Sequence, residues 1–271
     1  MSTGKQDCWI SLPITKYQSG TLRECAAQVV QEVEINVSVN GRYVHTLTCS
    51  PWDIEELAVG YLFFKNTIKS RLDIESVQIN KAAGVAEVLL ATKPEQPGNQ
   101  KTQACETAEG KTSHKKPHFR DAAGLPFVES TLQVQAGQIN SLAVHLEKNS
   151  LLFKKTGGVH SALLVKDNEV AAWFEDIGRH SAVDKLAGWC VLNDVDTANS
   201  ILLFSGRVPY EIITKAIHLR CPIVISPGAP TNLSIELAAL HGVTLIGFAK
   251  NGEFNVYTHP QRVLIIGRAE E

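Results

Sequence analysis

The sequence predicts an α/β protein with a smaller N-terminal α+β domain over residues 1–130 and an α/β domain over residues 131–271. Beyond residue 156, short apolar runs of strand length alternate with stretches of helix length, which is typical of a partly parallel sheet covered by helices. Upstream, alternating β-branched and polar residues surround Asn40-Gly41, a strong signal for a two-residue hairpin. A polar segment separates the two patterns.

In the N-terminal domain, the residues up to about Arg23 show no clear periodicity. The hairpin is expected over residues 34–48. A helix should follow, with Ser50 as its N-cap, Pro51 at the first helical position and Asp53 as an acid in the first turn. Its apolar face is expected to pack on the hairpin. A second pair of strands is predicted at residues 74–80 and 85–91.

Residues 92–123 are polar and contain three prolines, so we expect a mobile loop there. This segment carries one cysteine, Cys105. Two interpretations stay open from the residues alone. Cys105 is either an incidental thiol, or an accessible thiol whose thiolate form is favoured by Lys101 and Lys111.

In the C-terminal domain, the pattern predicts an ordered series of helices and strands. The first helix covers about 136–148, and a hairpin turns over Asp167-Asn168. Ser181 and Asp184 resemble a capping box, and Glu211 and Lys215 have the spacing of a surface ion pair. The predicted strands cover residues 160–166, 169–176, 201–204, 222–226 and 243–248, and the later helices 179–192, 209–220 and 232–241.

Four polar turns follow predicted strands in this domain, where an open parallel sheet binds its ligands. Small residues in these turns allow a ligand close to the backbone, and two arginines and a lysine suit a phosphate or pyrophosphate group. The turns cover residues 176–180, 205–207, 226–232 and 248–253. The candidate binding residues are Gly178, Arg179, His180, Ser205, Gly206, Arg207, Phe248, Ala249, Lys250, Asn251, Gly252 and Glu253.

The composition excludes several other classes of function. A net charge of −2 argues against a dedicated nucleic-acid or membrane surface, and no apolar run approaches the length of a bilayer span. The start of the sequence has no signal-peptide pattern, so a cytoplasmic location is expected. The six cysteines are scattered without a CxxC pair, which predicts free thiols, with Cys190 and Cys221 in the core, and no metal site. Neither a zinc-deaminase signature nor a common phosphate-loop motif is present.

Several motifs together resemble the formate dehydrogenase accessory sulfurtransferase family (FdhD). They are TGGVHSALL, EDIGRHSAVDK, SPGAPTNLSIELA and GFAKNGEFNVYTHP, which are found in the family's order. The resemblance implies a cytidine-deaminase-like three-layer core and a homodimer. It also implies a sulfurtransferase of carrier type, which moves sulfur from a cysteine desulfurase to the molybdenum bis-pterin guanine dinucleotide cofactor of formate dehydrogenase. The cofactor would be bound as cargo, partly by residues 248–253.

Members of that family carry sulfur as a persulfide on the first cysteine of a CGxCG loop. The corresponding segment here reads TQACETAEG, over residues 102–110. Cys105 matches the first cysteine, and Ala108 stands in place of the second. The resemblance therefore makes Cys105 the persulfide carrier. The alternative is a cofactor-binding chaperone that does not transfer sulfur, and a nucleotide-processing enzyme on the same core is a third hypothesis.

Overall fold

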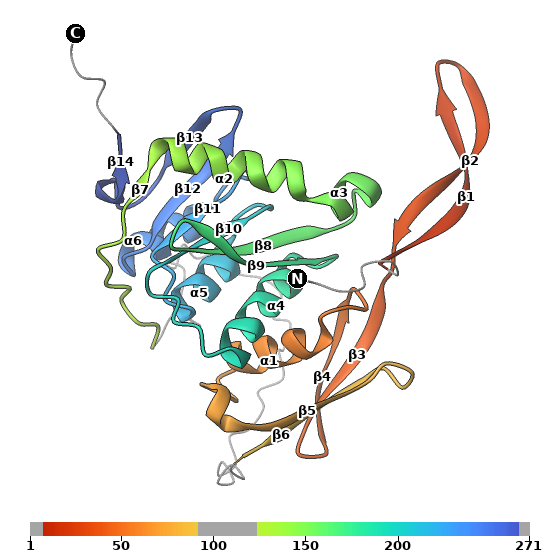
Figure 1. Cartoon of the computed structure of the whole chain (residues 1–271), viewed down its shortest axis with the longest axis horizontal. Helices are drawn as coiled ribbons and strands as arrows, with labels where there is room; N and C mark the ends of the chain where they lie inside the picture. The colour runs from red at the N-terminus through yellow and green to blue at the C-terminus, as the bar shows by residue number, and fades with distance from the viewer. Residues whose placement is uncertain (1–7, 92–123, 266–271) are drawn as a thin grey trace, which may run out of the picture.

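The computed structural model describes residues 8–91 and 124–265 (Figure 1). The predicted mobile loop at residues 92–123, with Cys105 in it, lies outside the described residues. The part of the chain that the structure describes contains no helix long and apolar enough to cross a membrane.

A six-stranded sheet forms the centre of the C-terminal part of the chain, with the order β13-β12-β11-β10-β8-β9. Strands β10, β11 and β12 are parallel, whereas β8 is antiparallel to both β9 and β10. The predicted hairpin over Asp167-Asn168 is confirmed, since both residues adopt positive φ between β8 and β9. The strands are β8 (His160–Lys166), β9 (Glu169–Asp176), β10 (Ser200–Phe204), β11 (Ile223–Ile225), β12 (Thr244–Lys250) and β13 (Glu253–Val256).

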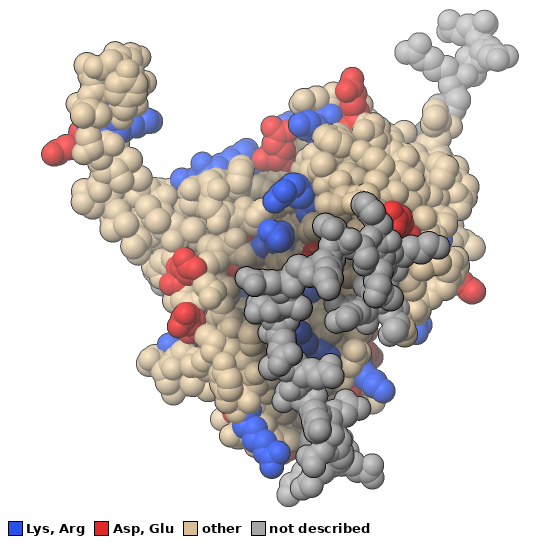
Figure 2. Space-filling view, turned by 180° about the vertical axis from the view of Figure 1, so that it is seen from behind, with Lys and Arg blue, Asp and Glu red and all other residues tan. Residues whose placement is uncertain are grey.

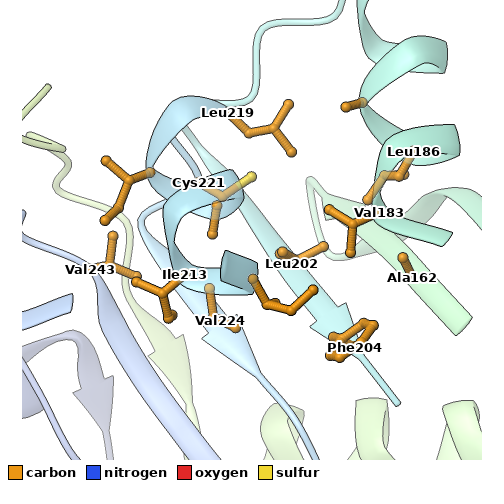
Figure 3. Close-up of a cluster of buried hydrophobic side chains, with 14 of the residues drawn as sticks. Ala162, Val183, Leu186, Leu202, Phe204, Ile213, Leu219, Cys221, Val224 and Val243 are labelled. Atoms are coloured by element: carbon orange, nitrogen blue, oxygen red, sulfur yellow. The ribbon is translucent and has the colours of Figure 1, made fainter. Parts of the chain in front are cut away.

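Helices cover both faces of this sheet, which confirms the three-layer α/β core. Alternate residues of β8 and β10 point to opposite faces. Leu163 and Leu203 pack under α2 (Ala136–Asn149). Ala162 and Leu202 face the other layer, where Val183 of α4 and Ile213 of α5 meet them (Figure 3). That layer consists of α4 (Arg179–Leu192), α5 (Tyr210–His218) and α6 (Asn232–Leu240).

The predicted N-terminal hairpin and helix are also confirmed. Strands β3 (Val33–Val39) and β4 (Arg42–Cys49) turn over Asn40-Gly41, and they form a four-stranded sheet with β5 (Ile74–Asn80) and β6 (Val85–Leu90). Helix α1 (Ile54–Phe64) packs its apolar face on this sheet. Its other side crosses α4 at Gly60 and Gly188, where a Cβ on either glycine would lie 1.8 Å from a backbone oxygen of the other helix.

The expected role of Ser50 as an N-cap is wrong. Helix α1 begins at Ile54 and its N-cap is Asp53, which makes no side-chain cap bond to the helix. Ser50 is buried and binds across the molecule instead: its amide donates to the Asp176 carboxylate (3.0 Å), and its hydroxyl accepts from the Ile177 amide (3.1 Å). The hydrogen bonds of Ser50 therefore go to residues 126 and 127 positions away in the sequence, and not to the adjacent helix.

The segment before β3 forms a long two-stranded ribbon that the sequence pattern did not predict. Strands β1 (Trp9–Gln18) and β2 (Thr21–Val30) are antiparallel and turn at Ser19-Gly20, and the ribbon projects away from the rest of the molecule (Figure 1). Nearly all of its side chains are exposed in the single chain. Ile10, Leu12 and Ile14 alternate with Ser11, Pro13 and Thr15 in β1, but a proline within the run argues against a strand, and the residues of β2 show no alternation.

Two expected polar pairs in the helices are wrong. No side chain caps α4, whose N-cap is Gly178, so Ser181 and Asp184 do not form a capping box. Lys215 does not make the surface pair with Glu211, because its ammonium forms a short ion pair with Asp184 of α4. The shorter elements are η2 (Arg71–Asp73), α3 (Leu151–Thr156), η3 (Pro260–Arg262) and the β7–β14 pair (Val134–Gln135, Val263–Leu264).

Candidate functional site

The four predicted turns lie at one edge of the central sheet. Strand β9 runs in the same direction as β10, β11 and β12, because β8 is antiparallel to both of its neighbours. The carboxyl ends of these four strands therefore meet at the same edge, and a polar turn follows each of them. This arrangement confirms the topological basis on which the site was predicted.

Three of the turns are hydrogen-bonded to one another. The Ser226 hydroxyl donates to the Gly206 carbonyl (2.5 Å), the Phe248 amide donates to the Gly228 carbonyl (3.1 Å), and the Ala249 amide donates to the Ser226 carbonyl (3.0 Å). Gly228 is required at this contact, since a Cβ there would lie 2.5 Å from the Gly206 oxygen. The three turns therefore form one braced surface rather than three independent loops.

A cavity of about 320 Å³ opens beside these turns. Ser205, Lys250 and Asn251 line one side of it, together with His160 at the start of β8. Side chains of α2 and α3, most of them apolar, also line it. The cavity thus offers one cation (Lys250), one carboxylate (Glu147), hydroxyl and amide groups and apolar side chains to a ligand, and we call it the rim cavity. Its lining residues are Ala143, Val144, Leu146, Glu147, Ser150, Phe153, Val159, His160, Ser161, Ser205, Pro227, Ala249, Lys250 and Asn251.

The remaining candidates take different positions. Arg179 and Arg207 are exposed, and neither is among the residues that line the rim cavity. The same holds for exposed Phe248 within β12, for exposed Gly252 and Glu253 at the turn into β13, and for Gly178 and buried Gly206. Arg179 is nevertheless close enough to His160 to help lower the pKa of that imidazole, after the larger effect of burial.

His180 lines a second cavity, of about 620 Å³, between α1, α4 and α5. The Asp184–Lys215 ion pair also lines it, and the Lys215 ammonium lies 4.9 Å from the centre of the Phe64 ring. Burial raises the pKa of Asp184, and the adjacent ammonium opposes that rise. The structure therefore does not bring His180 together with Lys250 in one cavity, as a single binding rim would require.

A fully buried ion pair lies below the turn after β9. The Lys185 ammonium is 2.8 Å from the Asp176 carboxylate, and both side chains are inaccessible to solvent. Asp176 also accepts from the amides of Ser50 (3.0 Å) and Gly178 (2.8 Å). The Trp52 indole donates to the Glu175 carbonyl (3.0 Å) and its ring faces the ammonium. These contacts join the segment before α1 to the start of α4.

His160, Ser161 and the α2–α3 wall are the lining residues that we did not predict as site residues. The sequence pattern places His160 only at the start of a predicted strand and the α2 residues only in a predicted helix. The signal available in the sequence was the position of His160 directly after Gly157-Gly158, within one of the motifs that carried the family resemblance.

Charge is unevenly distributed over the face of the molecule shown in Figure 2. Outside the grey atoms, both acidic and basic side chains lie around the edge of this face, and basic side chains are also found near its centre (Figure 2). Among the described residues, no group of three or more His, Cys, Asp or Glu side chains could hold a metal ion.

Three histidines near the two cavities should titrate below the ordinary value of 6.5. Burial lowers the pKa of His160, His180 and His218, and Lys215 adds to this effect at His180. The unfolded chain binds these protons more readily, so the stability that the neutral rings contribute is present above about pH 6.5. It is lost as the pH falls toward the lower pKa values of the folded state.

NMR titration of the ring protons measures the three midpoints. His180→Gln should reduce the loss of stability between pH 6.5 and 5. If stability falls with pH as steeply in this variant as in the wild type, the pKa of His180 is not lowered in the folded protein.

The architecture is that of a three-layer α/β protein, and comparison with known proteins identifies its family. A model of the FdhD/NarQ family matches residues 30–264, and the chain belongs to this family. It is 34% identical to the sulfur carrier protein FdhD of Staphylococcus haemolyticus (strain JCSC1435), over 92% of this chain and 95% of that protein. It is 32% identical to the sulfur carrier protein FdhD of Staphylococcus aureus (strain MRSA252), over 96% and 98% of the two chains.

A solved structure agrees with the fold. The crystal structure of a chain from Desulfotalea psychrophila, assigned as a formate dehydrogenase accessory protein, superposes with a TM-score of 0.78. The two chains are 23% identical, and the match covers 95% of this chain and 100% of the other. The expected family resemblance is therefore confirmed by sequence, and the expected fold by structure.

Proposed function

We propose that this protein carries sulfur from a cysteine desulfurase to the molybdenum bis-pterin guanine dinucleotide cofactor of formate dehydrogenase, in the cytoplasm. Membership of a family whose curated relatives are named sulfur carrier proteins supports the sulfur step. The observation that carries the cargo step is the rim cavity, because two of the three braced turns bring Ser205, Lys250 and Asn251 to one opening. We also propose that the protein is a homodimer.

The sulfur step needs one accessible thiolate. The Cys105 thiolate attacks the outer sulfur of the donor persulfide, the donor S–S bond breaks, and the donor cysteine leaves as a thiolate. Cys105 then holds the persulfide. Four of the five described cysteines are buried, and burial raises the pKa of the Cys49 and Cys190 thiols to about 12, so these are poor nucleophiles. Cys25 is the exposed exception and serves as the matched control.

Sulfur loading tests this step directly. The protein is incubated with a cysteine desulfurase and cysteine, and persulfides are located by peptide mass spectrometry. Cys105→Ser should abolish the added sulfur, whereas Cys25→Ser and Cys190→Ser should retain it. If the wild-type protein gains no sulfur, or if the sulfur is found on Cys25, the carrier role of Cys105 is wrong.

The second candidate function is a chaperone that holds the cofactor without moving sulfur. Ala108, in place of the second loop cysteine, is the observation that favours it. A guanine nucleotide that binds to a wild-type protein unable to accept sulfur would support this alternative.

Guanine nucleotide binding tests the cargo step. Lys250→Ala should weaken the binding of GDP by about 1–3 kcal/mol, because it removes a charge-assisted contact at the rim cavity. Arg179→Ala should also weaken the binding of GDP, because it removes a positive charge that attracts the phosphate groups. Lys81→Ala, in the exposed turn between β5 and β6, is the control and should leave the affinity unchanged. Equal affinities of all four proteins in calorimetry would place the nucleotide elsewhere.

A further inference from the structure

The second cavity, between α1, α4 and α5, is larger than the rim cavity, at about 620 Å³ against about 320 Å³. Aromatic rings from two of these helices line it, and they belong to Tyr61, Phe64, Tyr210 and His218. The Phe64 and His218 rings pack edge to face, with their centres 5.6 Å apart. Such walls suit a planar aromatic ligand, because rings pack favourably on one another's faces and edges.

The charged groups of the second cavity are two carboxylates and two ammonium groups. Asp184 and Glu211 supply the carboxylates, and Lys65 and Lys215 supply the ammonium groups. Lys215 is paired with Asp184, whereas Glu211 forms no ion pair within the described part of the chain. An unpaired carboxylate beside aromatic rings can accept hydrogen bonds from the N–H groups of a heterocycle, and a lysine can donate to a ring carbonyl.

A single turn connects the two cavities. His160, which lines the rim cavity, is paired with Asp176 across β8 and β9, and the turn that follows Asp176 leads to His180 in the second cavity. The four residue steps from Asp176 to His180 span at most about 14 Å. Burial is the main cause of the lowered pKa of both histidines, and the exposed Arg179 guanidinium, in the same turn, adds to it at both rings. Arg179 therefore lies within electrostatic reach of both cavities.

We infer that the second cavity binds a pterin, a bicyclic 2-amino-4-oxo heterocycle, as the other end of the ligand whose guanine nucleotide occupies the rim cavity. The identity of the ligand rests on the proposed function, and the second cavity as the place of its pterin is the new assignment. The Glu211 carboxylate accepts from the ring N–H and 2-amino groups, and the Lys65 ammonium donates to the 4-oxo group. The diphosphate between the two ends passes Arg179.

Size assigns the two ends of the ligand to the two cavities. Guanine and pterin present the same edge, with an amino group, a ring N–H and a carbonyl, so these groups alone do not distinguish them. In the proposed cofactor the pterin carries a further fused ring, and this end is bulkier than guanine. The bulkier end belongs in the larger cavity, where aromatic side chains from α1 and α5 cover it.

Binding of 6-hydroxymethylpterin, followed by its fluorescence, tests this assignment. The wild-type protein should bind this pterin alone and in the presence of saturating GDP, because the two molecules occupy different cavities. Glu211→Gln should weaken pterin binding about tenfold, since it removes a charged acceptor. Lys65→Ala should also weaken it, because it removes the donor to the 4-oxo group. Glu236→Gln, at an exposed position of α6 outside both cavities, is the matched control and should retain the wild-type affinity.

Three results would each overturn the assignment of the second cavity. They are a wild-type protein that does not bind the pterin, competition between the pterin and GDP, and equal pterin affinities of Glu211→Gln and the wild type. Calorimetry with GDP on the same proteins judges the rim cavity separately. Pterin binding without GDP binding would contradict the cargo step proposed at the rim cavity and would leave the second cavity as a pterin site.

Discussion

Replacement of Gly188 by alanine is expected to lower the free energy of unfolding by at least about 3 kcal/mol, because the new methyl group has no space. Its Cβ would lie 1.8 Å from the carbonyl oxygen of Glu56 and 2.8 Å from the amide nitrogen of Gly60, both backbone atoms of α1. Backbone atoms of a helix cannot rotate away as a side chain can. The two helices would have to separate, and the packing of α1 against α4 would be lost.

The control for this prediction is Gly137→Ala in α2. Gly137 is also helical, but a Cβ at that position meets no atom within 4 Å. Alanine is a better helix former than glycine by about 1 kcal/mol in a helix interior, so this variant should be as stable as the wild type or slightly more stable. Urea unfolding followed by circular dichroism compares the three proteins. Equal midpoints for Gly188→Ala and the wild type would show that the crossing is looser than described.

Loss of one partner of the Asp176–Lys185 pair should have an effect of similar size. Asp176→Asn removes the carboxylate charge and leaves the Lys185 ammonium uncompensated where neither side chain reaches solvent. Removal of one member of a buried pair typically costs about 3–5 kcal/mol. The amides of Ser50 and Gly178 would also lose their charged acceptor, so the connection between the segment before α1 and the start of α4 should weaken.

A double variant separates the cost of the stranded charge from the loss of the contacts. Asp176→Asn with Lys185→Met removes both charges, and it should recover part of the stability that Asp176→Asn loses. Glu169→Gln, at the exposed start of β9, is the control and should change the stability by no more than about 0.5 kcal/mol. If the double variant is less stable than Asp176→Asn alone, the stranded ammonium is not the source of the loss.

Much of the fold could be predicted because its signals are local. The turns at Asn40-Gly41 and Asp167-Asn168 require positive φ, which asparagine, aspartate and glycine tolerate, so they predict hairpins without tertiary information. The strands of the central sheet are short apolar runs because helices cover both of their faces. The β1–β2 ribbon was missed because a proline stands within the alternating residues of β1 and because β2 shows no alternation.

The candidate site could be predicted only in part. The order of strands and turns in the sequence was sufficient to place the candidate turns at the carboxyl ends of successive strands. Which side chains share a cavity depends on how the turns pack, and here His160 joins Ser205, Lys250 and Asn251 while His180 opens into another space. The role of Cys105 follows from its correspondence to the family motif and remains a prediction.

The sequence by itself determined the class of fold, the family and the positions of most strands and helices, since these depend on periodicity, turn residues and motifs read along the chain. Only the tertiary structure decided the partners of the polar side chains. Ser50 and Lys185 meet at Asp176, and Lys215 pairs with Asp184 rather than with Glu211. The physical reason is that burial makes a polar group costly unless it finds a partner, and the partner is whichever group the packing of distant segments brings within reach.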